Sequence, residues 1–420
     1  MSDHHSPTTG LVLSGGGARA AYQTGVLEAI ADLRIACGLP RRNSPFQILC
    51  GTSAGAINAS AIACGADHFD DTVRHLARIW RNFQASHVYR ADSLSVLRSG
   101  AHWLTLLSLG WTVARWRKAN PHALLNNQPL AELLAEQIRL DRLPGLIQDG
   151  HLSALAVTAS SYTTGEHITF YQSHDARPPW IRSQRKAVRT RMTHTHLLAS
   201  SAIPFIFPAR AVNYDGQMHY LGDGSMRQTA PIAPAIHLGA DRILVVGSGR
   251  MKEPEAVVPR GVEPAYPSLA QIGGHALSSI FLDALSVDIE RAERVNQTLS
   301  LIPPEARAHS PLRTLNLLVL TPSERIDEIA SRHIHELPGT IRALLGTVGV
   351  KEPEPGQALA GAGGAALASY LLFEAGFTNE LMALGHKDVD TKKEEICAFF
   401  GWTPPRPKST GYNEYQHQLE

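Results

Sequence analysis

Short apolar runs alternate with segments of helical spacing along the first sixty residues. The run 11–14 stops at three glycines. Beyond the glycines, Val26, Ile30 and Leu33 fall on one face of a helix. A second apolar run, residues 46–50, leads directly into a helix of small residues. This order of strand, helix, strand and helix predicts a parallel sheet flanked by helices.

Residues 67–142 show mainly helical spacing, and strand patterns return after them. The later predicted strands are 154–159, 167–171, 218–221, 242–246 and 315–320, and the later predicted helices are 196–201 and 268–300. We therefore expect an α/β fold over residues 8–322, a three-layer α/β/α sandwich with a mainly parallel central sheet. A mainly helical C-terminal extension with a polar tail is expected over 323–420, and 351–356 is a candidate linker within it.

The composition supports a large buried core and disfavours one class of partner. Apolar residues make up 44% of the 420 positions and charged residues 18%. The 39 Lys and Arg residues balance the 38 Asp and Glu residues, so no net field attracts a polyanion. We expect no nucleic-acid partner, and no pattern specifies an oligomeric state.

The cysteines and the chain start bear on the cellular compartment. Cys37, Cys50, Cys64 and Cys397 are too widely spaced for a zinc site and are expected to be reduced, mostly buried thiols. The first ten residues lack the basic and apolar regions of a secretory signal, so we expect a cytoplasmic protein. The apolar stretch nearest to membrane-spanning length, 356–373, is rich in Gly and Ala. It is expected to dock on the main domain, or else against another chain.

The motif GTSAG at 51–55 places Ser53 between a predicted strand and a predicted helix. Glycines two residues before and after a serine permit a sharp turn that lifts the hydroxyl above the sheet edge. The N-terminus of the following helix also favours developing negative charge. The alternative is a small-residue turn packed under a helix. The flanking elements favour a nucleophilic serine.

The segment SGGGARA at 14–20 lies at a second turn from strand to helix. Its three glycines expose backbone N–H groups that can converge on an anion. Gly15, Gly17 and Ala20 also satisfy a dinucleotide-binding pattern. That pattern needs an acidic residue at the end of the next strand, whereas Asp32 lies inside the first helix, so the nucleotide interpretation is disfavoured. No Lys-Ser or Lys-Thr pair follows as in a phosphate-binding Walker loop.

A serine hydroxyl becomes a useful nucleophile only when a base takes its proton. Asp223, between Gly222 and Gly224 after a short predicted strand, is the candidate base. Gly-Asp-Gly by itself is more typical of a surface turn. The presence of three motifs of the right type in one chain favours the catalytic interpretation.

Together these motifs resemble the patatin-like phospholipase family. The matching segments are GGGARA at 15–20, GTSAG at 51–55, ASSAIPFIFP at 199–208 and DGS at 223–225. The resemblance covers roughly residues 8–322 and keeps the family's motif order. The first domain is thus expected to be a patatin-like acyl hydrolase domain.

The resemblance implies a Ser-Asp dyad, with Ser53 as nucleophile and Asp223 as base. It further implies an oxyanion-binding loop and supporting glycines. The loop is Gly15, Gly16, Gly17, Ala18 and Arg19, and the supporting residues are Gly51, Gly55 and Gly224. Two positions depart from the family, which usually has glycine at Ala20 and glycine or alanine at Ser225. A triad with His237 or His275 as third member is the disfavoured alternative.

The expected reaction is hydrolysis of fatty-acyl esters of (phospho)lipids through an acyl-enzyme. Alternatives are an acyl-thioesterase or acyltransferase on the same dyad, or a non-catalytic lipid-binding or interaction module. The resemblance implies no cofactor and no metal. The pairs His4/His5, His194/His196 and His333/His335 lack carboxylate or cysteine ligands at matching spacing. The expected partner is a lipid, with peripheral membrane contact as one candidate interaction.

Two further features keep alternatives open. Arg19 can face an anionic phosphate or headgroup, or it can be solvated or form a structural ion pair. Residues 101–116 carry three tryptophans and are apolar around most of a helix. Burial of this helix is favoured over a lid or interfacial role, because such a helix is normally buried and 16 residues are too few to span a membrane.

Overall fold

The computed structural model describes residues 7–41, 43–90, 123–174, 178–251, 266–307, 309–350 and 362–405. The tryptophan-rich segment 101–116 and the candidate linker 351–356 lie outside the described residues. So do the first part of the Gly/Ala-rich segment 356–373 and the polar tail after residue 405.

The described residues form one ten-stranded sheet. Its parallel part has the order β10-β9-β1-β2-β3. These strands are β1 (Thr9–Leu13), β2 (Ile48–Thr52), β3 (Ala154–Ser161), β9 (Arg242–Val246) and β10 (Asn316–Leu320). The antiparallel β4 (His167–Ser173) continues the sheet to β6 (Arg185–Arg189) and β5 (Ile181–Arg182). A hairpin of β7 (Arg210–Tyr214) and β8 (Gln217–Asp223) joins the end of β3.

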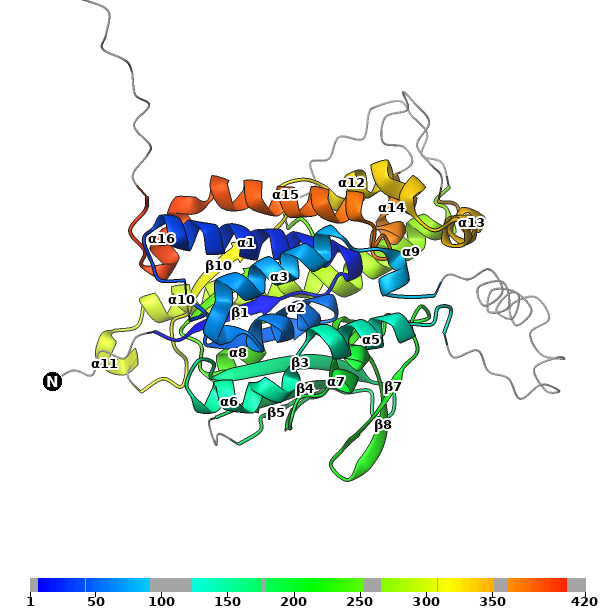
Figure 1. Ribbon diagram of the computed structural model, residues 1–420. Helices are drawn as coiled ribbons and strands as arrows, with labels where there is room; N and C mark the ends of the chain where they lie inside the picture. Colours follow the sequence, from blue (N-terminus) through cyan, green and yellow to red (C-terminus); the bar gives the residue numbers. More distant parts are fainter. Residues whose placement is uncertain are drawn as a thin grey trace, which may run out of the picture.

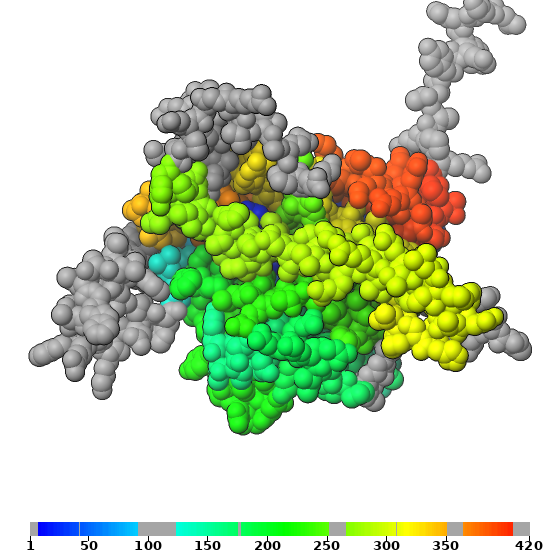
Figure 2. Space-filling view, turned by 180° about the vertical axis from the view of Figure 1, so that it is seen from behind, coloured from blue at the N-terminus to red at the C-terminus, as the bar shows by residue number. Residues whose placement is uncertain are grey.

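Helices cover both faces of this sheet (Figure 1). One face carries α1 (Ala21–Ala36), α2 (Ala54–Ala63) and α3 (Phe69–Arg81). The other face carries α8 (Ala233–Leu238) and α10 (Ala284–Ser300), and Figure 2 shows it crossed by the yellow-green to yellow segment that holds α9 (Leu269–Ser278) and α10. The remaining helices are α5 (Gln128–Gln137), α6 (Leu143–Gln148), α7 (His194–Ser200), α11 (Pro304–Arg307), α12 (Ile326–His333), α13 (Gly339–Thr347), α14 (Ala362–Ala368), α15 (Ala375–Thr391) and α16 (Lys393–Phe400).

The predicted three-layer α/β/α architecture with a mainly parallel sheet is confirmed. The predicted strands 154–159 and 167–171 are also present, as β3 and β4, and they pair antiparallel as a hairpin. Sequence analysis missed β5, β6 and β7, which lie outside the parallel part of the sheet. In β6, the sequence RKAVR carries three cations, so its pattern lacks the apolar alternation of a half-buried strand. The predicted helix 268–300 is interrupted by a π-helical turn, Ser279–Asp283.

Among the described helices, one passes a length and composition test for a membrane span. It is Leu269–Ser300, whose most apolar 18-residue window has a mean hydropathy of 1.2 and is 28% buried within the molecule. Phe281, Leu285 and Ile289 of this helix are buried, the last two among residues of the sheet. The helix therefore contributes to the outer layer of the sandwich.

The C-terminal helix α15 lies along α1 (Figure 1). Their backbones approach closely at glycines. A Cβ on Gly25 would collide with the Met382 carbonyl oxygen, and a Cβ on Gly385 would collide with the backbone of α1. The Tyr22 hydroxyl donates a hydrogen bond of 2.9 Å to Asp388 Oδ2. The extension is thus packed directly on the first helix of the sheet domain.

We expect Gly25→Ala to destabilise the protein by about 1–3 kcal/mol, because backbone atoms of α15 leave no room for a methyl group. Thermal unfolding measures this effect. Gly145→Ala is the matched control, since a Cβ there meets no atom within 4 Å and alanine favours the helix. An equal melting temperature for the two variants would contradict the close approach of α1 and α15.

Candidate active site

Ser53 occupies a strained turn between β2 and α2. Its φ and ψ are 55° and −131°, an unusual conformation for a residue with a side chain. Both motif positions require glycine, because neighbouring backbone atoms leave no room for a side chain. A Cβ on Gly51 would collide with Gly55 and Ala56. A Cβ on Gly55 would collide with the carbonyls that end β1. The turn therefore lies against the beginning of the glycine-rich loop, and Ser53 is 1% exposed.

Asp223 reaches the same place from a different part of the chain. It ends β8 and pairs with Ala159 on β3, the strand next to β2. Its backbone N–H donates to the Ala202 carbonyl at 3.0 Å. Gly224 is required here, because a Cβ would collide with Thr158. Pairing of adjacent strands thus brings position 223 beside the serine turn.

The carboxyl group of Asp223 is fully buried. Its Oδ1 accepts a hydrogen bond of 2.9 Å from the Ser225 N–H. Asp223 Oδ2 and Ser53 Oγ are also buried, and neither completes a hydrogen bond of standard geometry with a described residue. Burial raises the pKa of Asp223 to about 6, although the hydroxyls of Ser53 and Ser225 and the Ser225 N–H each lower it. Catalytic hydrogen bonds are often long in unliganded proteins.

The glycine-rich loop supplies backbone donors beside Ser53. The N–H groups of Gly15, Gly16 and Gly17, and that of Ala54 after the serine, donate to no described residue. Gly17 has a φ of 56°, which favours glycine. Ser248 Oγ donates to the Gly15 carbonyl and holds the loop from β9. Unpaired N–H groups next to a hydroxyl are suited to bind a developing oxyanion.

Two further serines contribute to the site, and sequence analysis gave no role to the first of them. Ser200 Oγ accepts a hydrogen bond of 2.9 Å from the Ser53 N–H. Ser225, where the family usually has glycine or alanine, is 4% exposed, and its hydroxyl lies against Gly15 and Asp223. The segment 199–208, which resembles the family, therefore supports both the serine and the carboxylate through Ser200 and Ala202.

Arg19 is buried and bound to the C-terminal segment. Its exposure is 4%, its Nε donates to Ser369 Oγ at 2.7 Å, and its Nη2 donates to the Ala366 carbonyl at 3.2 Å. These contacts differ from each role considered from the sequence, since the guanidinium is neither solvated nor in an ion pair with a described residue. The positions 369 and 366 lie some 350 residues away, so no local pattern signals the contact.

An apolar cavity opens at Ser53. Its walls come from α2, α3 and α5, with contributions from residues that follow α7 and α14. The lining residues include Ile57, Ala61, Leu76, Ile79, Trp80, Phe83, Leu130, Leu134, Ile203, Phe207 and Phe373. Sequence analysis missed this cavity. The apolar face of 69–81 was a detectable signal, but burial in a core produces the same pattern.

The described histidines do not form a triad at this site. His237 stacks on Trp180 at the N-terminal edge of the strands, beside Thr8 and Ile48, whereas Ser53 follows the C-terminal end of β2. His275 is exposed on α9. The one histidine among the described cavity residues, His75, pairs with Gln137. Within the described ranges, no group of three His, Cys, Asp or Glu residues could hold a metal ion.

The fold and the site together define an α/β protein with a hydrolase-type serine turn at the edge of its sheet. A model of the patatin-like phospholipase family matches residues 11–236. This match spans more than half of the chain, so the chain belongs to the patatin-like phospholipase family. It is, by family, a lipid acyl hydrolase.

Solved structures with distant similarity include one human and two bacterial proteins. Human GIVD cytosolic phospholipase A2 is 12% identical, with a TM-score of 0.45, and the match covers 94% of this chain and 60% of that protein. VipD from Legionella pneumophila is 14% identical, with a TM-score of 0.32 and coverages of 90% and 67%. ExoU in its complex with SpcU from Pseudomonas aeruginosa is 14% identical, with a TM-score of 0.24 and coverages of 86% and 77%.

The chain thus spans three fifths of the length of the human phospholipase. No curated protein sequence matches it. The family assignment rests on the sequence match over residues 11–236.

Asp223→Asn is expected to raise the melting temperature at pH 8. The pKa of Asp223 in the folded protein, about 6, exceeds the ordinary value of 3.8. Any stability from this group is present below the ordinary pKa and is lost as pH rises through 6, where a charge becomes buried. At pH 4 the folded carboxyl is protonated, and the gain should disappear. Thermal unfolding at both pH values tests this, and a variant that melts lower at pH 8 than wild type would contradict it.

Proposed function

We propose that the protein is a serine acyl hydrolase that cleaves fatty-acyl esters of phospholipids and related lipids through Ser53 and Asp223. One observation carries the proposal. A strained serine lines an apolar cavity beside unpaired backbone N–H groups. Strand pairing brings a buried carboxyl group, whose Oδ2 has no hydrogen-bond partner among the described residues, to the same turn. Membership of the patatin-like phospholipase family supports the lipid substrate.

In the proposed first step, Ser53 Oγ attacks the ester carbonyl carbon while Asp223 Oδ2 takes the hydroxyl proton. The carbonyl oxygen becomes an oxyanion, for which the N–H groups of Gly16, Gly17 and Ala54 are the proposed donors, since they donate to no described residue. Collapse of the tetrahedral intermediate breaks the bond to the alcohol, and Asp223 returns its proton to the leaving oxygen. A pKa of about 6 leaves the carboxylate largely ionised at neutral pH, while keeping it basic enough to accept a proton.

In the second step, water attacks the acyl-serine and Asp223 takes a proton from that water. The same N–H groups stabilise the second oxyanion. Ser53 then leaves with the proton from Asp223, and the fatty acid is released. This sequence requires neither a metal nor a cofactor, since the protein's own groups carry every proton.

The acyl chain is proposed to occupy the apolar cavity. Ala54, Ile57 and Ala61 line it along α2, so the cavity follows this helix away from Ser53. A helix rises 1.5 Å per residue, and the eight residues from 53 to 61 therefore span about 12 Å. We further propose that the protein contacts a membrane peripherally to reach its lipid substrate. Its cytoplasmic location stays a prediction from the sequence.

Ser53→Ala and Asp223→Asn are each expected to reduce hydrolysis of a lipid ester by at least about 10³-fold, because each removes a reacting group. A panel of phospholipids, lysophospholipids, neutral glycerides and acyl thioesters measures the activity. Fluorophosphonate labelling of wild type and Ser53→Ala reports the nucleophile directly. Thr391→Ala, on the surface of α15, is the control.

Different outcomes of this panel separate the alternatives. Faster turnover of thioesters, or transfer to an added alcohol, would support an acyl-thioesterase or an acyltransferase instead. Folded wild-type protein that neither labels at Ser53 nor hydrolyses any ester would support a non-catalytic lipid-binding module.

Ala61→Phe is expected to shorten the preferred acyl chain, because the larger ring fills the cavity away from Ser53. Loss of contact with about three methylenes, at about 0.8 kcal/mol each, corresponds to a fall in kcat/KM of roughly 50-fold for long-chain esters. Short-chain esters should be hydrolysed as before. Comparison of butanoyl, octanoyl and hexadecanoyl esters measures this. Equal losses for all chain lengths would argue against an acyl site beside α2.

A further inference from the structure

The C-terminal segment 366–373 contacts the glycine-rich loop. This segment follows the family match by 130 residues and ends at Phe373, which lines the cavity. It runs from α14 toward α15. We call it the C-terminal arm.

The arm meets the loop through its backbone. The Ala18 N–H donates a hydrogen bond of 3.2 Å to the Tyr370 carbonyl. A Cβ on Gly17 would collide with the same carbonyl oxygen. The third glycine of the loop is therefore required by the approach of the arm. The N–H groups of Gly16 and Gly17 lie immediately before the bonded Ala18.

The arm also holds the side chain of Arg19. Ser369 Oγ accepts from Arg19 Nε at 2.7 Å, and the Ala366 carbonyl accepts from Nη2 at 3.2 Å. The guanidinium lies 4.2 Å from the centre of the Tyr370 ring, which stacks on Phe281 of the π-helical turn. Ser369 is fully buried. Two nitrogen atoms of this arginine thus donate to the arm, and its guanidinium packs on an aromatic ring of the arm.

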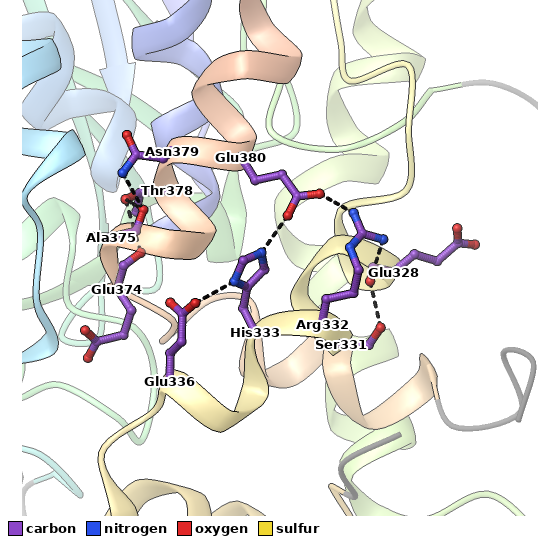
Figure 3. A network of polar contacts seen from close by, with 10 residues as sticks. All are labelled: Glu328, Ser331, Arg332, His333, Glu336, Glu374, Ala375, Thr378, Asn379 and Glu380. Carbon is purple, nitrogen blue, oxygen red and sulfur yellow. Dashed lines mark hydrogen bonds and ion pairs between the residues drawn. The ribbon is translucent and has the colours of Figure 1, made fainter. Parts of the chain in front are cut away.

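The chain that follows the arm is held by several polar contacts. Glu374 follows it and accepts from the Ala85 N–H at 3.3 Å. Figure 3 shows how α12 and α15 are joined: His333 lies between Glu336 and Glu380, at 2.7 and 2.6 Å, and Arg332 also pairs with Glu380. The arm leads into α15, and α15 packs on α1, the helix that follows the glycine-rich loop. The arm and the loop are therefore both connected to the same pair of packed helices.

We propose that the C-terminal arm positions the oxyanion-binding loop, with Ser369 and Tyr370 acting through Arg19 and Ala18. This inference rests on the proposed function. Three consecutive glycines have the greatest backbone freedom of any sequence, so the loop needs outside contacts to hold its N–H groups in one direction. Donors contribute to catalysis only when they point at the site of the developing charge.

Ser369→Ala and Tyr370→Leu test the proposal. The first removes the hydroxyl that binds Arg19 Nε, and the second removes the ring that packs on the guanidinium, while Ser53, Asp223 and the loop sequence stay unchanged. A displacement of about 1 Å in a catalytic group can lower a rate by about 10²-fold. We expect kcat to fall 10- to 100-fold with KM changed less than about twofold. Labelling by a fluorophosphonate, whose adduct places an oxygen in the oxyanion site, should slow by a similar factor.

Ser331→Ala is the matched control. Ser331 lies in α12 of the same extension and donates to the Glu328 carbonyl. It should retain wild-type kcat and wild-type labelling. A short-chain ester serves as substrate in all assays, so that chain binding in the cavity does not enter the comparison.

Arg19→Lys combined with Ser369→Ala provides a second measurement. If both residues act through the same contact, the double variant should be little slower than the slower single variant. If the losses in kcat of the two single variants multiply in the double variant, the two residues act independently. That result would contradict positioning through Arg19.

A purely structural role has a distinct signature. It would lower the melting temperature while kcat per labelled site stayed at the wild-type value, and that result would overturn the proposal. If Ser53→Ala remains active, the proposed function itself fails. If Ser53→Ala is inactive while Ser369→Ala and Tyr370→Leu match wild type, only the role of the arm fails.

Discussion

The structure depends on a close approach of two backbones. Gly55 follows the serine turn and lies against the carbonyls that end β1, where a side chain on residue 55 would not fit. This contact places the turn after β2 directly beside the loop after β1. The two strands are parallel neighbours, so their C-terminal ends meet at one edge of the sheet. A hydroxyl and a set of free N–H groups are thereby held together by main-chain packing.

Asp223 shows how the fold sets the chemistry of a carboxyl group. Full burial favours the neutral acid, while two hydroxyls and one backbone N–H favour the ion. The outcome is a pKa of about 6, which would suit the proposed role of accepting and returning a proton. A buried, incompletely paired carboxylate is costly for stability, and such costs are typical of functional sites.

The C-terminal extension is closely integrated with the sheet domain. Glycine contacts join α15 to α1, the Tyr22 hydroxyl binds Asp388, and the arm binds the glycine-rich loop. The family match ends at residue 236, so these contacts are made by a part of the chain beyond it. The glycine-rich loop is thus contacted by sequence that lies beyond the family match.

The sequence by itself determined the parallel α/β class, the strand-to-helix turns at 14–20 and 51–55, and the candidate pair Ser53 and Asp223. These features depend on local patterns, because a turn with no room for side chains requires glycine at that point in the sequence. Only the tertiary structure revealed the polar partners of Arg19, the apolar cavity, and the strands β6 and β5 that end one side of the sheet. Each of these depends on surfaces from distant segments: Ser369 lies 350 residues from Arg19, and the cavity needs three helices to close it. A local sequence pattern reflects the constraints that neighbouring residues in the chain place on one another. It does not show which distant segment supplies a hydrogen-bond partner, a cavity wall or a neighbouring strand.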